Sequence, residues 1–592
     1  MSINTNINIP QSPFLDPLTG RPAREWLIWL QNPSVINFNI ANALPITSGG
    51  TGIATAPNNG QLLIGNNKQY SLGYISGDSS IAVADNAGSI GLSLNSTGVT
   101  AGLYGSGTTI PQFSVNNKGQ LTFVQNVAFT GSVFYTAPFS GSVSRSSTSK
   151  WSDIVSVKDF GATGNGTTDD TTAIQNAINT GKKVYIPSGT YYITQPLTIS
   201  TAGQMIDGDG RNESILKITS TFNLSATGVI IFSTGEEGPQ LQNFGMAFTQ
   251  PDTSTRSSLT SYPVAIYAYN TPRFTIANLK ITNASNGINM TGNSGGAFID
   301  LLEMSAYGTG IAIDGSLDTI RINKYHFYNF GMTNNQASIF YSSGTLAISC
   351  GRCDGLLMDE FFNISNLALY TFAGSSGSPW VYINNSGFDT FNGIHHTSGK
   401  LTVNNSYFTN QDTGGFYNLI LESANGWSQF NNCAFFAGSG NGAPIILSAT
   451  SGLGNYQRAT FTNCICEGTP NGAYFYLSGI GSYLSIADTV FSATGNNARF
   501  VYTDGLSAQK LHLVNNYIDS PPNLTYANAM IYVSTNTRVY ATGNRINDKG
   551  SNSGTFIQIV TDNYNWVSGN IAPGWTNSFP SGSTGYYSGN LT

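Results

Sequence analysis

The sequence predicts an all-β protein whose larger part is a right-handed parallel β-helix, a solenoid in which each coil of chain pairs with the next. Two observations predict this fold. The 592 residues include 67 Gly, with 12% aromatic and only 9% charged residues, which indicates many short strands joined by tight turns. Beyond residue 270, similar strand patterns recur every 20–36 residues, and a repeat of this length is typical of solenoids, propellers and arrays.

The first 150 residues are expected to form separate modules. Residues 1–45 are one unit, in which Pro22 precedes a short helix, "REWLIWLQ", that carries Trp26 and Trp29. Residues 46–130 alternate short strands with Asn-Asn-Gly and Asn-Asn-Lys-Gly turns, which predicts a small β module. A Ser-rich linker follows over 131–152, and the β-helix is expected over 153–570.

The segment over 157–193 opens the predicted β-helix and reads "VKDFGATGNGTTDDTTAIQNAINTGKKVYIPSGTYYI". It predicts an amphipathic helix near 170–180 with Ile174 and Ile178 on its apolar face. We interpret Asp169 and Asp170 as residues that cap this helix and complement its dipole, not as a catalytic pair. The helix is expected to cover the N-terminal end of the core, an open edge that would otherwise recruit another chain.

The repeat itself consists of an alternating strand, a small polar residue and another apolar residue three places further on, as in "LTVNNSYF" and "LHLVNNYI". We call the fifth residue of each pattern the anchor. Stacked coils place successive anchors one above the other, so that the Asn anchors are expected to form a hydrogen-bonded ladder at a turn. Cys433 and Cys464 follow their anchors by one place and are interpreted as stacked buried thiols. The anchors are Asn278, Leu301, Lys324, Glu360, Asn385, Asn405, Asn432, Asn463, Asp488, Asn515 and Gly543.

Charge and composition exclude several classes of function. The net charge is −6 and no basic stripe occurs, which argues against nucleic-acid binding and mildly disfavours a strongly anionic substrate. No run approaches the ~20 apolar residues that span a bilayer, and the N-terminus lacks the pattern of a signal peptide. Without export, the five Cys are expected to be free thiols.

Three segments resemble parts of bacteriophage tailspikes. The 157–193 segment is similar to the entry of pectate-lyase-like β-helices. "PFLDPLTGRPAREWLIWLQN" resembles the N-terminal virion-attachment segment of phage tail fibres and spikes. "AGLYGSGTTIPQFSVNNKGQLTFVQNVAF" looks like a β module frequent in tail fibres.

The resemblance implies a homotrimer on the virion, attached through its N-terminus to a phage tail or baseplate protein. Its β-helix is then expected to bind a polysaccharide of the bacterial outer surface, O-antigen or capsule, and to cleave it. Such a protein is made in the host cytoplasm and inserts into no membrane. Residues 571–592 are expected to be a C-terminal cap or tail. Tailspikes share no catalytic motif, so no active site carries over.

Candidate catalytic residues therefore come from the chain itself. Hydrolysis of a glycosidic bond needs two carboxylates, one acid and one base or nucleophile, and the acidic residues crowd on three successive coils. An outward Asp on such a solenoid is more often simply solvated, and a His pair more often lies on the surface without a ligand. The catalytic candidates are Asp359, Glu360, Asp389 and Asp412. The candidates for substrate binding are Trp380, Tyr382, His395, His396, Tyr417 and Trp427.

Two alternatives stay open at this point. A lyase would act by β-elimination, with a base near C5 of a uronate and Ca²⁺ or another cation on its carboxylate. A purely binding spike would hold the polymer without shortening it. For the hydrolase no metal or other cofactor is expected.

Overall fold

The computed structural model describes residues 10–31, 50–128, 134–410, 417–422, 426–438, 443–449, 457–469, 472–493, 498–506, 508–520, 529–548, 554–561, 565–581 and 585–590. The chain forms two compact units, Met1–Ser147 and Thr148–Thr592. The division falls inside the segment that the sequence predicts as a linker. In the described part, no helix is long and apolar enough to cross a membrane.

The first unit holds a helix and hairpins. The predicted helix is present as α1 (Arg24–Gln31), and Trp26 contacts Trp29 and Phe14 through edge-to-face ring pairs. Two-stranded antiparallel sheets follow. They pair β1 (Gln61–Asn66) with β2 (Gln69–Tyr74), β3 (Ile81–Asn86) with β4 (Ser89–Leu94), β5 (Thr109–Val115) with β6 (Leu121–Ala128), and β7 (Phe134–Tyr135) with β8 (Arg145–Ser146).

The second unit begins with a capping arrangement close to the one the sequence predicts. After α2 (Ser147–Trp151) come β9 (Ile154–Ser156), the 3-10 helix η3 (Val157–Phe160), β10 (Asn165–Asp169) and α3 (Thr171–Ile178). Ile174 and Ile178 of α3 share an apolar lining with Ile186 and Leu197 of the first coil. The helix therefore closes the end of the core.

The carboxylates of Asp169 and Asp170 both accept hydrogen bonds from backbone N–H groups near this helix. Asp169 accepts hydrogen bonds from the Thr171 N–H and from the Thr194 hydroxyl. Burial raises its pKa, but these hydrogen bonds outweigh burial and leave the pKa below its ordinary value. Asp170 is buried and makes no side-chain capping bond to α3. It instead accepts from the N–H groups of Thr163 and Gly164. Asp170 therefore does not cap α3 as expected. Its carboxylate faces the glycine-containing loop and holds that loop in place.

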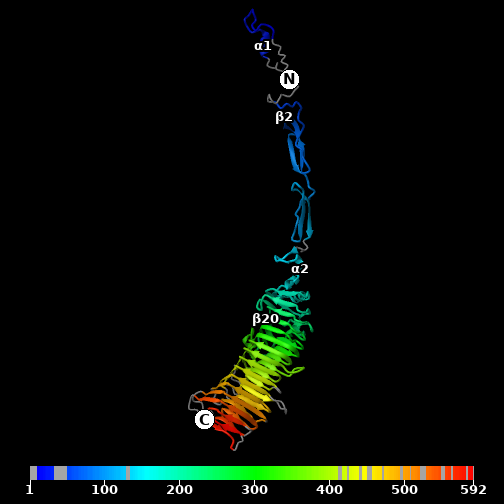
Figure 1. Cartoon of the computed structure of the whole chain (residues 1–592). Helices are drawn as coiled ribbons and strands as arrows, with labels where there is room; N and C mark the ends of the chain where they lie inside the picture. Colours follow the sequence, from blue (N-terminus) through cyan, green and yellow to red (C-terminus); the bar gives the residue numbers. More distant parts are fainter. Residues whose placement is uncertain are drawn as a thin grey trace. The chain divides into compact units, whose positions relative to one another are not determined.

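The remainder of the unit is a parallel solenoid built on two long sheets. Figure 1 shows its strands stacked in chain order from cyan to red. Within the described residues one sheet has 29 strands and the other 15, and neighbouring coils pair in parallel throughout. A typical coil contributes a strand before the anchor and a strand after it to the larger sheet, and a third strand to the smaller one.

The pre-anchor strands of the larger sheet are β11 (Lys183–Ile186), β14 (Met205–Gly208), β17 (Gln240–Gln242), β26 (Cys353–Asp359), β29 (Trp380–Asn384), β32 (Lys400–Asn404), β35 (Trp427–Asn431), β38 (Arg458–Thr462), β41 (Tyr483–Ala487), β44 (Gln509–Val514), β47 (Thr537–Thr542), β50 (Trp566–Ser568) and β52 (Tyr586–Ser588). The post-anchor strands are β12 (Gly189–Ile193), β15 (Ser214–Ile218), β18 (Gly245–Phe248), β27 (Phe362–Asn363), β30 (Gly387–Thr390), β33 (Tyr407–Asn410), β36 (Ala434–Ala437), β39 (Ile465–Gly468), β42 (Val490–Ala493), β45 (Tyr517–Ser520) and β48 (Arg545–Asp548). Three strands run through their anchors: β20 (Thr275–Ala284), β22 (Phe298–Ala306) and β24 (Ser316–Phe327).

The smaller sheet consists of β13 (Leu197–Ile199), β16 (Gly228–Phe232), β19 (Val264–Tyr267), β21 (Ile288–Thr291), β23 (Thr309–Asp314), β25 (Leu346–Cys350), β28 (Leu367–Thr371), β31 (Asn392–His396), β34 (Leu419–Leu421), β37 (Ile445–Ala449), β40 (Ala473–Gly479), β43 (Arg499–Thr503), β46 (Ile531–Val533), β49 (Thr555–Ile559) and β51 (Thr576–Ser578). Two short helices, η4 (Arg256–Ser258) and α4 (Asn334–Tyr341), lie in connections between strands. The long interval before Glu360, expected to be a loop at a groove wall, contains α4, whose Phe340 packs on Phe327 of the core.

The anchors share one backbone conformation. Every anchor predicted from the sequence has a positive φ, between 50° and 69°. Asn and Gly tolerate this left-handed region better than other residues, which explains why Asn recurs there. Leu301, Lys324 and Glu360 adopt it as well. Glu360 therefore has the same backbone conformation as the other anchors, and its place at an anchor does not by itself mark it as a catalytic residue.

Side-chain ladders join the coils at this turn. Asn432 donates to Asn405 at 2.8 Å, and Asn463 donates to Asn432 at 3.3 Å, so the predicted Asn ladder is confirmed. A second ladder lies one place after the anchors, where Asn544 is fully buried. Its Oδ1 accepts from both the backbone N–H and the side chain of Asn516.

Stacked side chains also fill the interior. Phe388 and Phe408 stack with ring centroids 4.4 Å apart, and Phe430 and Phe461 stack at 4.7 Å. The five Cys are free and buried, as expected. The coil does not end where the sequence predicted a cap, because β51 pairs with β49 and β52 pairs with β50. The described residues between 571 and 590 thus add a further part-coil to the solenoid.

The buried ladder generates the first prediction. Replacing Asn544 by Ala leaves the two Asn516 donors without their common acceptor, and we expect a loss of about 2–3 kcal/mol in the free energy of unfolding. Asn547→Ala is the matched control, because Asn547 lies on the same coil, is half-buried and donates to Asp519 alone. Denaturant midpoints measure both variants. Equal losses of stability in the two variants would show that the ladder contributes no more than an ordinary side-chain hydrogen bond.

Candidate functional site

The predicted carboxylates that the structure describes lie on two neighbouring coils. Asp359 ends β26, is half-buried, and accepts a hydrogen bond from Asn385 at 2.8 Å. Glu360 is exposed at the anchor itself. Asp389 lies on β30 of the next coil and accepts from the Thr409 hydroxyl. Asp412 falls outside the described residues. The structure therefore places Asp359 and Glu360 at one anchor turn and Asp389 on the post-anchor strand of the next coil.

The two His candidates differ from each other. His395 points outward from β31 and its Nε2 lies 2.9 Å from Glu422. His396 is fully buried, with Nδ1 2.8 Å from the Thr371 hydroxyl, and burial lowers its pKa to about 4. The expectation that His396 contacts a substrate is therefore wrong, because successive residues of a strand face opposite sides. His395 also lies on a different sheet from Asp389, since the chain turns between β30 and β31. Tyr417 lies half-buried before β34.

Trp380 and Trp427 belong to a larger feature, the outer face of the pre-anchor strands from β29 to β52, which we call the pre-anchor face. Burial alternates along each of these strands, so that every second side chain points outward. Parallel pairing in register then aligns outward residues of successive coils in columns. One column contains Trp380, Lys400, Trp427, Arg458, Tyr483, Lys510 and Arg538.

A second column lies two residues further along the same strands. It contains Tyr382, Thr402, Gln429, Thr460, Ser485, His512, Tyr540, Trp566 and Tyr586. Its last members form a run of rings: His512 lies 5.5 Å from Tyr540, and Trp566 stacks on Tyr586 at 4.1 Å between centroids. The face thus presents a long row of rings and cations.

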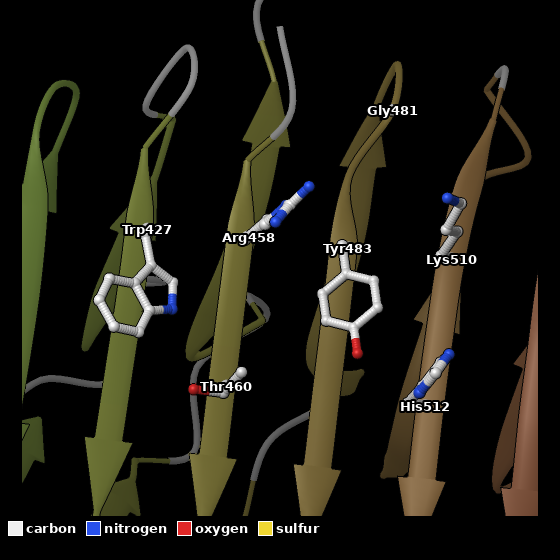
Figure 2. A pocket seen from close by; sticks show the side chains of 7 residues that line it. All are labelled: Trp427, Arg458, Thr460, Gly481, Tyr483, Lys510 and His512. Atoms are coloured by element: carbon white, nitrogen blue, oxygen red, sulfur yellow. The ribbon is translucent and has the colours of Figure 1, made fainter.

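A cavity of about 700 Å³ opens on this face. Figure 2 shows its lining side chains on neighbouring strands, with Arg458 and Lys510 in one row and Thr460 and His512 below them. Trp427, which sequence reasoning selected, stands at one end and is 38% exposed. The lining consists of Trp427, Arg458, Thr460, Gly481, Tyr483, Lys510 and His512.

The electrostatics of the cavity are set by its cations. Arg458 and Lys510 are exposed at its edge, and none of the lining residues is acidic. Half-burial, and to a lesser degree the charge of Lys510, lowers the pKa of His512 below its ordinary value. The imidazole is therefore neutral at neutral pH and can accept a proton or a hydrogen bond. Such a site favours an uncharged or anionic ligand with apolar faces.

Charge is segregated between the two halves of the larger sheet. The pre-anchor strands β29 to β52 contain no Asp or Glu, whereas the post-anchor strands β30 to β48 carry Asp389, Glu467, Asp519 and Asp548 with one cation, Arg545. The net negative charge of the chain therefore says little about this face. Among the described residues, no group of three or more His, Cys, Asp or Glu is arranged to hold a metal ion.

Sequence reasoning missed Arg458, Tyr483, Lys510 and His512. A signal for them was present, because the first column lies five residues before each anchor and the second column three residues before it. The prediction followed acidic residues instead, and so it centred on the coils that carry Asp359, Asp389 and Asp412.

Residues 154–343 match the family model described as rhamnogalacturonase A/epimerase, pectate lyase-like. Over these residues the chain is similar to pectate-lyase-like proteins. The matched region ends before the cavity begins at Trp427. The cavity thus lies on coils of the solenoid that the family model does not cover.

Curated relatives match short stretches. Mannuronan C5-epimerase AlgE2 of Azotobacter vinelandii is 38% identical over 103 residues, which is 15% of this chain and 10% of the relative. The pre-neck appendage protein of Bacillus phage phi29 is 36% identical over 63 residues, 11% of this chain and 7% of the relative. The chain thus spans about a tenth of the length of these relatives.

Solved structures align over more of the chain at low identity. Gene product 12 of bacteriophage phi29, in its pre-mature form, aligns with a TM-score of 0.47 and 14% identity, covering 69% of this chain and 57% of the other. The tailspike protein gp49 of Pseudomonas phage LKA1 aligns with a TM-score of 0.39 and 14% identity, covering 72% and 82%.

The cavity generates a prediction about His512. Replacing Lys510 by Gln removes a neighbouring positive charge, so the pKa of His512 should rise, while half-burial keeps it below the ordinary value for His. The chain has four His, so spectra of ¹³C-labelled His can be assigned by comparison with His512→Gln and titrated. Lys400→Gln, four strands away, is the control and should leave the pKa unchanged. A pKa that stays constant in Lys510→Gln contradicts the arrangement described.

Proposed function

We propose that the protein is a tailspike-type appendage of a phage virion that binds a polysaccharide on the outer surface of its host bacterium. The observation that carries the proposal is the pre-anchor face, with its aligned rings and cations around a cavity of about 700 Å³. The phage appendage among the curated relatives and the polysaccharide-modifying enzymes beside it support the same class. The similarity to phage attachment segments near residues 13–32 supports the virion location.

The physical basis is the complementarity of sugars to this surface. The C–H faces of pyranose rings pack on aromatic side chains, and their hydroxyls bond to polar neighbours. Trp427 and Tyr483 supply ring faces on alternate strands, and Thr460 and His512 supply hydrogen-bonding groups beside them. All four side chains stand on paired strands, so the surface is ordered before a ligand arrives.

The assembly in which this surface works is part of the proposal. The N-terminal unit, with α1 and its hairpins, attaches the protein to a tail or baseplate protein. The solenoid acts as a homotrimer, held together by its own faces and by the N-terminal modules. The protein is made in the host cytoplasm and works at the bacterial outer surface as part of the virion.

We further propose that the bound polymer is cleaved, with hydrolysis by the predicted carboxylates as the first candidate. Asp359 accepts a hydrogen bond from Asn385, and Asp389 accepts one from the Thr409 hydroxyl. Glu360 stands exposed between them in sequence. Acid–base cleavage of a glycosidic bond requires two carboxylates, and these candidates stand on neighbouring coils.

A second candidate reaction is β-elimination at the cavity. Its lining holds no carboxylate but has two cations, a neutral His512 and the Tyr483 hydroxyl. Arg458 or Lys510 would neutralise a uronate carboxylate, His512 would take the C5 proton, and a hydroxyl would protonate the leaving oxygen. The cations of the chain make a bound Ca²⁺ unnecessary for this step.

Binding is tested with the full chain and a panel of purified capsular and O-antigen polysaccharides. Trp427→Ala should weaken the tightest interaction by about 1–3 kcal/mol, the loss of one ring platform. Tyr502→Ala is the matched control on the smaller sheet, where Tyr502 stacks on Tyr532 at 5.0 Å. If only Tyr502→Ala weakens binding, the site lies on the other sheet. Absence of binding to every polysaccharide would overturn the proposed function.

Cleavage is tested on the polysaccharide that binds. Hydrolysis releases reducing ends without new ultraviolet absorbance, whereas elimination also creates an absorbing C=C bond. If the carboxylates act, Asp389→Asn should lower turnover by at least about 10²-fold and His512→Gln should leave it nearly intact. The reverse pattern, together with new absorbance, assigns the reaction to the cavity. An unshortened polymer leaves a binding spike and contradicts both reactions.

A further inference from the structure

We propose that the pre-anchor face selects an acidic polysaccharide in which acidic and neutral sugars alternate, and that the polymer lies across the strands, along the stacking direction of the coils. This inference rests on the proposed function and specifies its substrate class. It is drawn from the order of side chains in the first column of the face.

Rings and cations alternate in that column without a break over six coils. Trp380 on β29 is followed by Lys400 on β32, and Trp427 on β35 by Arg458 on β38. Tyr483 on β41 is then followed by Lys510 on β44. The alternation ends at β47, where Arg538 follows Lys510 directly. Each coil thus adds one group, and groups of the same kind recur every second coil.

The spacing of this pattern corresponds to a disaccharide. Neighbouring strands lie about 4.8 Å apart, so like groups recur about every 9.6 Å. That distance is close to the length of one disaccharide in an extended glycan. A polymer along the column would place one sugar of each pair on a ring and the other beside a cation. Six coils accommodate about 24 Å of such a chain, five strand spacings.

The chemistry of the two kinds of position differs. Trp380 is 45% exposed and Trp427 is 38% exposed, so each offers a broad apolar surface to a neutral sugar. Lys400, Arg458 and Lys510 are exposed and offer charged donors to a carboxylate. The Lys400 ammonium already lies 3.9 Å from the centre of the Trp380 ring, which keeps it beside the column.

The residues around the first column favour the binding of an anionic group. None of the pre-anchor strands from β29 to β52 contains Asp or Glu, although the whole chain has a net charge of −6. The second column beside these cations offers uncharged donors and acceptors in Thr402, Gln429, Thr460 and Ser485. A carboxylate on the ligand therefore meets cations and neutral hydrogen-bonding groups, and no competing carboxylate.

A single-stranded nucleic acid fits this column less well. It carries a phosphate on every residue and stacks every base, whereas here a cation and a ring each occur only at every second coil. A polyuronate with an acid on every sugar has the same mismatch. Both polymers serve as discriminating probes.

The experiment measures binding of the full chain to hyaluronan, heparosan and unsulfated chondroitin, in which glucuronate alternates with an N-acetylhexosamine. The comparison probes are the same polymers with carboxyls reduced to alcohols, oligogalacturonate and oligo(dT). At physiological salt, we expect at least one alternating polymer to bind about tenfold more tightly than its reduced form, the combined effect of several exposed ion pairs. Its affinity should fall as salt rises.

Variants locate the effect on the column. Arg458→Gln should lower affinity for the acidic polymer and leave affinity for the reduced polymer unchanged, whereas Arg458→Lys should keep most of it. Arg545→Gln is the matched control, because Arg545 is an exposed cation on the post-anchor strand β48. Circular dichroism and sedimentation confirm that each variant keeps the fold and oligomeric state of the parent.

Three results overturn the inference and are distinguishable from failure of the proposed function. One is equal binding of the acidic and reduced polymers, with Trp427 still required. Another is tighter binding of oligogalacturonate or oligo(dT) than of every alternating polymer. The third is an Arg458→Gln variant that changes the oligomeric state but not glycan affinity, which would make the column a subunit contact. If no polysaccharide of any kind binds, the proposed function itself fails.

Discussion

Parallel pairing between coils at a single left-handed residue is the constraint on which the rest of the molecule depends. At each anchor the chain adopts a positive φ, and where Asn anchors stack, ladder hydrogen bonds fix a coil against its neighbours. Because the turn is one residue long, it permits no slippage: a shift by one place would move buried side chains to the surface. Insertions such as α4 therefore occur in connections away from this turn.

The fixed register makes each outward position part of a column. A column can vary in chemistry without affecting the core, because alternate residues of a strand face opposite sides. The charge of the outward residues differs between pre-anchor and post-anchor strands. Lys400, Arg458 and Lys510 stand on pre-anchor strands, whereas Asp389, Glu467 and Asp519 stand on post-anchor strands. These cations and anions thus stand on separate halves of the larger sheet, and a chain with few charged residues still presents a cationic face.

The sequence predicted the fold more completely than the site, for a physical reason. The anchors, the Asn ladder and the stacked Cys433 and Cys464 follow from local backbone preference and period, which a single chain displays. The prediction for His396 required knowing which residues of β31 point outward after the preceding turn, and His396 was wrongly assigned to the outward set. The cavity depends on residues that become neighbours only through stacking, such as Trp427 and His512. Counting back from the anchors would have found them, whereas a search for acidic residues could not.

Repetition also explains how weak contacts can select a polymer. An exposed ion pair or a ring contact contributes little by itself, but groups on rigid strands are engaged together once a chain lies along the column, and each further contact is intramolecular. A monosaccharide contacts only one ring or one cation, so it gains no affinity from several contacts made together. A polymer of the wrong period meets the first groups of a column and then loses register with Arg458 and Lys510. A solenoid therefore measures the period of its ligand as well as its chemistry, because the strand spacing that stabilises the fold is the same spacing that separates the binding groups.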